Sequence, residues 1–265
     1  MEATTPTPAK SPTPVDGPVH SEAGITPTAR SRQIARRSQF LGLLAFLKHP
    51  TLPERPLGAT GASIWATLRL LMIDIAFMTI LIMIALAITA GGVEIPENAL
   101  DNMALTIPLI LLIIVLAPIF EEMVFRSWLS GRPGFVVPAV ILMIGVVVSA
   151  LLVTTYPIIG IPVGLAGVAL SLWAAARLKD REPWPFFTRH FRWFFYGTCL
   201  AFAAVHLTNF DGANAGFAPL VIPQLVSGTI FGFARVHYGL WSAIFLHMAH
   251  NSVFIAAALS EAAFG

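Results

Sequence analysis

Two adjacent glutamates, Glu121 and Glu122, interrupt the apolar stretch LLIIVLAPIFEEMVFRSWLSG (residues 111–131), and Arg126 follows the second by four positions. A charged side chain at the centre of a membrane helix costs at least about 2.5–3.5 kcal/mol on insertion scales. Two neighbouring carboxylates also repel each other. Ionisable residues in such a setting are candidates for a functional site.

Three more polar side chains lie in later apolar segments. CLAFAAVHLTNF contains His206, and LWSAIFLHMAHNSVF contains His247 and Asn251. At about 1.5 Å of rise per helical residue, a helix ending at Gly131 places Glu121 about 15 Å from its end. Helices starting at residues 197 and 238 place His206 and His247 about 13 Å in. We therefore expect the side chains of Glu121, His206 and His247 to lie at the same depth in the membrane.

Helical spacing divides these residues into pairs and separates the two glutamates. Residues four apart share a helix face, which pairs Glu122 with Arg126, and His247 with Asn251. Glu121 points about 100° away from Glu122. We expect a structural Glu122 and a less compensated Glu121 that can act as a general base or acid.

This constellation is compatible with two kinds of chemistry. In peptide hydrolysis, a carboxylate and one His activate water, while a second His and an Asn amide stabilise the oxyanion. In a zinc site, the ligand candidates are Glu121, His206 and His247, with an open position for water. The residues alone leave both open, so the cofactor is either a divalent metal such as zinc or none.

The composition indicates an integral membrane protein. Of 265 residues, 56% are hydrophobic and 11% are charged, whereas soluble domains carry about 25% charged residues. A span needs about 20 apolar residues, which predicts an all-α bundle of about seven spans at residues 64–90, 104–126, 133–154, 157–177, 197–213, 217–234 and 238–260. We place it in the cell membrane as a multi-pass protein. The sequence pI of about 9.0 reflects basic tail and loop residues rather than nucleic-acid binding.

The chain divides at about residue 60. Residues 1–60 are rich in Pro and Thr, which predicts a disordered tail with a short membrane-surface helix at residues 40–50. Residues 61–265 form the transmembrane domain. Lys and Arg fall in alternate connections, which predicts a cytosolic N-terminus. We expect a site within the membrane that opens to the cytosol.

Three motifs in order, EEMVFR (residues 121–126), FAAVH (202–206) and HMAHN (247–251), resemble the CPBP family of intramembrane proteases. The family includes type II CAAX prenyl endopeptidases and the Abi or lysostaphin-resistance-like proteins, and the resemblance covers about residues 104–255. It implies that Glu121 and His206 activate water and that His247 and Asn251 form the oxyanion hole. It also implies that Glu122, Arg126 and Phe202 support the site.

The expected function is endoproteolysis of membrane-presented or lipid-anchored, CAAX-like substrates within the bilayer. The alternatives are a non-catalytic immunity or scaffold protein of the same family and a transporter that uses the polar cluster. Three further residues remain open: Asp74 is expected to pair with Arg69 or with another helix, His250 is a candidate for a supporting role, and Cys199 is a weak candidate for a thiol nucleophile.

Overall fold

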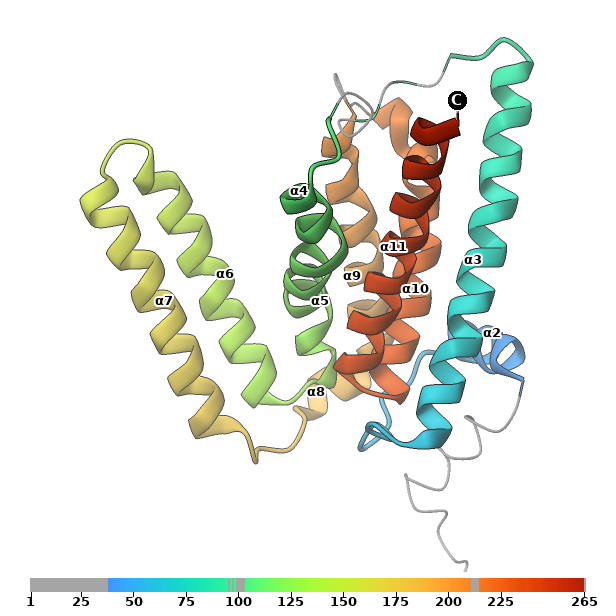
Figure 1. Cartoon of the computed structure of the whole chain (residues 1–265). Helices are drawn as coiled ribbons and strands as arrows, with labels where there is room; N and C mark the ends of the chain where they lie inside the picture. The colour runs from blue at the N-terminus through green and yellow to red at the C-terminus, as the bar shows by residue number, and fades with distance from the viewer. Residues whose placement is uncertain (1–37, 95, 97, 99–102, 211–214, 265) are drawn as a thin grey trace, which may run out of the picture.

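The computed structural model describes residues 38–94, 96, 98, 103–210 and 215–264, and these residues are almost entirely helical (Figure 1). The tail predicted at residues 1–60 lies outside the described residues up to residue 37. The described helices confirm the all-α class. Their bounds are α2 Gln39–Lys48, α3 Gly61–Ala90, α4 Ile107–Leu111, η1 Leu112–Leu116, α5 Ala117–Arg126, η2 Ser127–Ser130, α6 Pro133–Val153, α7 Pro157–Leu178, α8 Pro185–Arg189, α9 Phe191–Val205, η3 His206–Asn209, η4 Ala215–Val221, α10 Ile222–His237 and α11 Leu240–Phe264.

Six helical segments among the described residues are long and apolar enough to cross a membrane. They correspond to six of the seven predicted spans. The remaining one, predicted at residues 197–213, is α9, a helix of 15 residues that is followed by the short η3. Because α9 runs alongside the long helices in Figure 1, the chain still passes up and down the bundle in alternation.

Local sequence signals set the ends of α3 and of the second span. Thr60 and Ser63 form a reciprocal capping box at the start of α3, which satisfies backbone donors that a helix start leaves free. The second span ends at Gly131, whose φ of 65° is a left-handed conformation that glycine adopts readily. The GRPG segment therefore stops this helix, as the sequence predicts.

The second span is not a regular α-helix. Residues Leu112–Leu116 form a π-helical turn in which the Ala117 N–H bonds to the Leu112 carbonyl, five residues back. The next residue, Pro118, has no N–H to donate. In the same pattern the N–H of residue 118 would bond to the Ile113 carbonyl. Because Pro118 cannot make this bond, the Ile113 carbonyl receives no hydrogen bond from it.

An aromatic cluster joins α2, α9 and α10 at one end of the bundle. The Phe46 ring lies edge-on to the rings of Phe195 and Phe233, at centroid distances of 4.9 and 5.3 Å. Phe46 and Leu43 are buried. The helix predicted at residues 40–50 is therefore present, and one of its faces packs against the bundle.

The start of α9 differs from the predicted start at residue 197. The helix begins at Phe191, in the segment that we expected to lie at the membrane interface. Our depth estimate assumed that all helices begin at one level. Phe191 and Phe195 instead pack beside α2 and Phe187, so α9 starts further out and His206 still reaches the level of Glu121.

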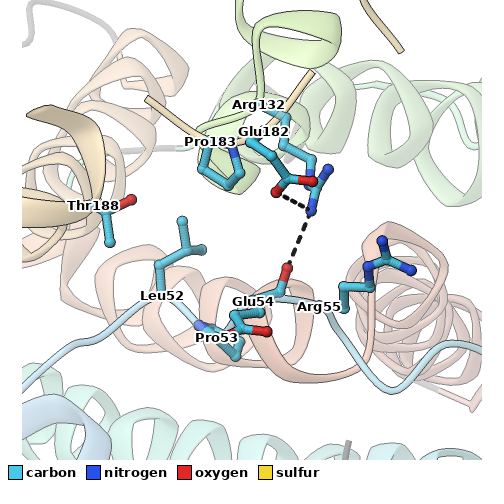
Figure 2. A pocket seen from close by; sticks show the side chains of 8 residues that line it. All are labelled: Leu52, Pro53, Glu54, Arg55, Arg132, Glu182, Pro183 and Thr188. Atoms are coloured by element: carbon cyan, nitrogen blue, oxygen red, sulfur yellow. Dashed lines mark hydrogen bonds and ion pairs between the residues drawn. The ribbon is translucent and has the colours of Figure 1, made fainter. Parts of the chain in front are cut away.

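The same end of the bundle brings loops together around Arg132 (Figure 2). Arg132 donates to the Glu182 carboxylate at 3.2 Å and to the Glu54 carbonyl at 3.4 Å. These contacts tie the segment before α3 and the loop after α7 to the start of α6. A shallow hollow lies between them, with Arg55 and Thr188 at its edge.

Candidate active site

Glu122 and Arg126 form a buried ion pair on α5. Arg126 Nη1 donates to Glu122 Oε1 at 2.7 Å, and both side chains are fully buried. The spacing of four residues puts them on one helix face, as the sequence predicts. His247 Nδ1 also bonds to Glu122 Oε1, at 3.0 Å. Glu122 therefore links α5 to α11.

The rest of the Arg126 guanidinium lies against aromatic rings. Its Cζ atom is 3.8 Å from the centroid of the Phe202 ring, a geometry in which the ring face attracts the cation. Arg235 donates to the carbonyls of Arg126 and Ser127 at 2.9 and 2.8 Å. It thereby satisfies backbone acceptors at the C-terminal end of α5.

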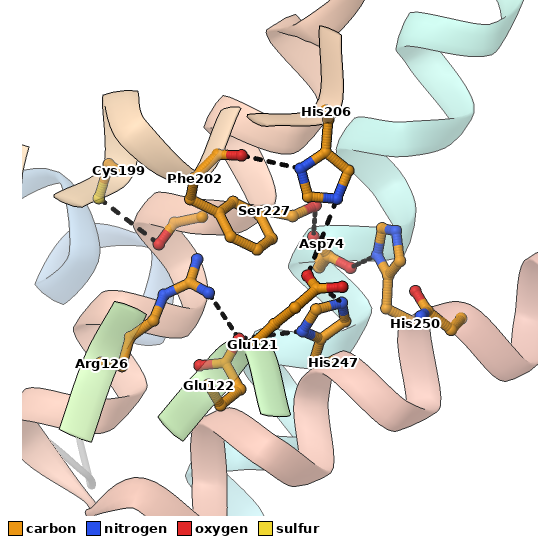
Figure 3. A network of polar contacts seen from close by, with 12 residues as sticks. Asp74, Glu121, Glu122, Arg126, Cys199, Phe202, His206, Ser227, His247 and His250 are labelled. Atoms are coloured by element: carbon orange, nitrogen blue, oxygen red, sulfur yellow. Dashed lines mark hydrogen bonds and ion pairs between the residues drawn. The ribbon is translucent and has the colours of Figure 1, made fainter. Parts of the chain in front are cut away.

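Glu121 faces a different group of residues (Figure 3). Its Oε2 atom lies 3.8 Å from His206 Nε2 and 3.9 Å from His247 Nε2. That oxygen is buried and has no hydrogen-bond partner among the described residues. Polar atoms at such distances are well placed to share a water molecule or a substrate group.

His206 is held in a defined orientation by its own helix end. Its Nδ1 atom lies 2.8 Å from the Phe202 carbonyl. A carbonyl can only accept a hydrogen bond, so Nδ1 carries the proton and Nε2 is left facing Glu121. The Phe202 ring packs against the imidazole at a centroid distance of 4.7 Å.

His247 lies between the two glutamates. Its Nδ1 atom bonds to Glu122 and its Nε2 atom faces Glu121. The Phe231 ring stacks on the imidazole at 5.1 Å. This bridge was not predicted, because the sequence gives no register between α5 and α11.

Asn251 anchors α11 to the π-helical turn. Its Nδ2 atom donates to the Ile113 carbonyl at 2.8 Å, the carbonyl that Pro118 cannot serve. An amide nitrogen has two N–H groups, so one remains for the cavity beside Glu121. Pro118, three residues before Glu121, is the feature of the sequence that points to a carbonyl in need of a side-chain donor.

A second buried carboxylate reaches the same region from α3. Asp74 is fully buried, and its two oxygens contact His250 Nδ1 at 2.6 Å and Ser227 Oγ at 2.8 Å. Asp74 thus pairs with other helices, one of the two expected outcomes. His250 is part of the cavity wall, and Asp74 connects α3 to α10 and α11.

These side chains surround a cavity of about 320 Å³. Glu121, His206, His247 and Asn251 all line it, together with apolar residues and the amides of α10 and the connections. Cys199 does not line it, because its buried Sγ contacts the Gly228 carbonyl at 3.6 Å. The thiol is therefore not placed to attack a group in the cavity.

The zinc alternative is not supported. In the part of the chain that the structure describes, no group of three or more His, Cys, Asp or Glu side chains has the arrangement of a metal site. We derive no chemical step through a metal.

Residues 103–253 match the sequence family described as type II CAAX prenyl endopeptidase Rce1-like. The chain belongs to this family. The match begins just before α4 and ends within α11, so it contains all three motifs and leaves α2 and α3 outside. No curated protein and no solved structure gives a significant match.

Membership of the Rce1-like family supports a CAAX-type intramembrane protease in general terms. The six long apolar helices agree with this, since they make the chain a multi-pass membrane protein. The bilayer and a membrane-presented substrate are the partners that such a protease requires.

Proposed function

We propose that this chain is an intramembrane endopeptidase that hydrolyses peptide bonds of membrane-presented or lipid-anchored polypeptides, with Glu121 as its central catalytic residue. The observation that carries the proposal is the position of Glu121 Oε2. This oxygen is buried without a hydrogen-bond partner and faces the Nε2 atoms of two histidines at 3.8 and 3.9 Å. A water between these three atoms would have an acceptor ready for its proton.

In the proposed reaction, Glu121 and His206 activate this water. The Nε2 atom of His206 has a free lone pair, because Nδ1–H donates to the Phe202 carbonyl. Glu121 takes the proton as the water oxygen attacks the peptide carbonyl carbon. General-base assistance of this kind contributes typically about 10²–10⁴-fold to the rate.

His247 and Asn251 are the proposed donors to the oxyanion. In its protonated form His247 donates from Nδ1 to Glu122 and from Nε2 into the cavity. Asn251 uses one N–H on the Ile113 carbonyl and has a second one available. Donors held in place before the reaction stabilise the developing charge without reorganisation.

Collapse of the tetrahedral intermediate completes the proposed cycle. The C–N bond breaks, and protonated Glu121 returns its proton to the leaving amine. The products are a carboxylic acid and an amine, and the carboxylate of Glu121 is restored. Glu122 and Arg126 take no proton in this scheme and hold His247 in place.

The test compares wild type, Glu121→Gln and the control Glu94→Gln in liposomes with a panel of lipid-anchored and transmembrane peptides. Glu94 is an exposed carboxylate on the connection after α3. We expect Glu121→Gln to lower kcat by about 10²–10⁴-fold, with a melting temperature close to that of wild type. Glu94→Gln should cleave like wild type.

Three results would contradict the proposal. Equal cleavage by wild type and Glu121→Gln would remove this carboxylate as the base. Full biological complementation by a folded, inactive Glu121→Gln would favour a scaffold or immunity protein instead. Solute uptake by liposomes that show no cleavage would favour a transporter.

A further inference from the structure

A third histidine lines the cavity beside His206 and His247. His250 follows His247 by three residues on α11, and helix positions three apart lie next to each other on one face. The side chain of His250 is 16% exposed, whereas that of Asp74 behind it is fully buried. An accessible imidazole in such a cavity is suited to carry a proton.

Asp74 fixes the protonation pattern of the His250 ring (Figure 3). Asp74 Oδ2 lies 2.6 Å from His250 Nδ1, and the hydroxyl of Ser227 donates to Asp74 Oδ1 at 2.8 Å. An ionised carboxylate only accepts hydrogen bonds, so Nδ1 of His250 carries a proton. The other ring nitrogen, Nε2, is left for groups in the cavity.

Aromatic rings hold the His250 imidazole without using its Nε2 atom. The Phe231 ring lies edge-on to it at a centroid distance of 5.8 Å, and the Phe254 ring lies at 4.6 Å. Among the described residues, no hydrogen bond reaches Nε2. Its lone pair is therefore available to accept a proton.

We infer that the Asp74–His250 pair carries the proton from Glu121 to the leaving amine. The inference rests on the proposed peptidase function and adds to it one catalytic residue, His250, and one positioning residue, Asp74. A carboxylate bonded to an imidazole holds the ring in one tautomer and stabilises the imidazolium that forms when the ring takes up a proton. Asp74 lies on α3, outside the residues 103–253 that match the family.

The proton balance of the step closes. The attacking water gives one proton to Glu121, and a second water in the cavity passes it on to Nε2 of His250. When the C–N bond breaks, the leaving nitrogen keeps the bonding electron pair and takes the proton from Nε2. The products are a carboxylic acid and an amine, and the Glu121 carboxylate and the neutral His250 are restored.

The spacing of His247 and His250 fits the two ends of one peptide bond. The oxygen and nitrogen of a peptide bond are only about 2 Å apart, and side chains at neighbouring positions on a helix face are about 5–6 Å apart at Cβ. A carbonyl oxygen at His247 therefore leaves the amide nitrogen within reach of a group on the next position of α11.

The test compares a peptide that wild type cleaves with its ester analogue, in which oxygen replaces the leaving nitrogen. An amide nitrogen must be protonated before it leaves, whereas an ester oxygen leaves much more readily without a proton. We expect His250→Gln to lower kcat for the amide by about 10²–10⁴-fold and to leave ester cleavage unchanged. Asp74→Asn should show the same selective loss on the amide.

The matched control is His190→Gln. His190 precedes α9, is partly exposed and does not line the cavity, so this variant should cleave both substrates like wild type. Melting temperatures are measured for every variant, and Asp74→Asn carries the comparison if His250→Gln does not fold. Unchanged amide cleavage, or an equal loss on amide and ester, would overturn the inference, because a group that merely shapes the cavity affects both substrates.

The outcome is separable from that of the proposed function. Glu121→Gln should lose both activities, since water attacks the carbonyl carbon of either substrate. If Glu121→Gln is inactive on both but His250→Gln still cleaves the amide, the peptidase stands and the proton carrier fails. If Glu121→Gln cleaves both substrates like wild type, the proposed base fails, and with it the transfer from Glu121 to His250.

Discussion

The bundle of α3, α5, α9, α10 and α11 and the hairpin of α6 and α7 are packed in different ways. The bundle buries Asp74, Glu122 and Arg126. The hairpin has no charged residue from Pro133 to Ala176, and in Figure 1 it leans away from the bundle. An apolar hollow of about 550 Å³ lies between its α6 and the helices α5, α8 and α9.

Small residues hold the hairpin together. A Cβ atom added to Gly145 would lie 3.0 Å from the Cα atom of Gly167, so the two backbones approach closely. Ser149 Oγ donates to the Gly160 carbonyl at 2.8 Å. Close backbone contact and small polar side chains are the usual means of helix association in a bilayer.

The two regions therefore differ in whether they contain buried charged side chains. The hairpin demonstrates that the same chain can join two helices without any charge. Buried ionisable groups in the bundle are costly, and three of them hold side chains of the cavity wall. Glu122, paired with Arg126, bonds to His247, and Asp74 bonds to His250.

The largest expected effect comes from breaking the central ion pair. Arg126→Met should lower the free energy of unfolding by about 3–5 kcal/mol, because it leaves the Glu122 carboxylate buried without its cation. The measurement is denaturant unfolding in mixed micelles. The matched control is Arg132→Met, which breaks an ion pair with the largely exposed Glu182 and should cost at most about 1 kcal/mol. Equal losses would mean that burial does not distinguish the two pairs.

A smaller effect is expected from the tie between α3 and the rest of the bundle. Asp74→Leu leaves His250 and Ser227 without their carboxylate partner, and each buried polar group left unpaired costs about 1–3 kcal/mol. The melting temperature should fall, and hydrogen exchange in α3 should rise. Asp180→Leu, in the exposed turn after α7, should stay within about 0.5 kcal/mol of wild type. If Asp74→Leu has the wild-type stability and unchanged amide hydrogen exchange in α3, the contacts of Asp74 with His250 and Ser227 do not hold α3 in place.

The smallest effect is expected in the hairpin. The Cβ atom of Gly160→Ala would lie 2.6 Å from the backbone nitrogen of Val153, and such overpacking costs about 1–3 kcal/mol. Gly197→Ala in α9 meets no atom within 4 Å and should be neutral or slightly stabilising. Thermal unfolding measures both, and peptidase activity should survive in both. Loss of activity in Gly160→Ala alone would mean that the hairpin contributes to catalysis.

Much of the site could be predicted from residue spacing. The rotation of about 100° per residue separates Glu121 from Glu122. In the structure Glu121 faces His206 and Glu122 pairs with Arg126, while His247 lies between the two carboxylates. The i, i+4 relation pairs Glu122 with Arg126 and places Phe202 beside His206. These are local properties of single helices, and they need no knowledge of the other spans.

Contacts between helices could not be predicted in the same way. The depth of His206 depends on where α9 begins. We assumed that all helices begin at the same level, which predicted a start at residue 197, whereas α9 begins at Phe191. The partners of His247 and Asp74 depend on the rotation of α11 and α3 about their axes. The hydropathy of the sequence does not specify these rotations, because a membrane-spanning helix is apolar on most of its faces.

The sequence by itself determined the membrane character of the chain, the six long spans and the polar groups that they carry. The tertiary structure alone decided that His247 bridges two glutamates and that Asn251 donates to the Ile113 carbonyl. Each of these outcomes depends on the relative height and rotation of separate helices, which only side-chain packing between them can set.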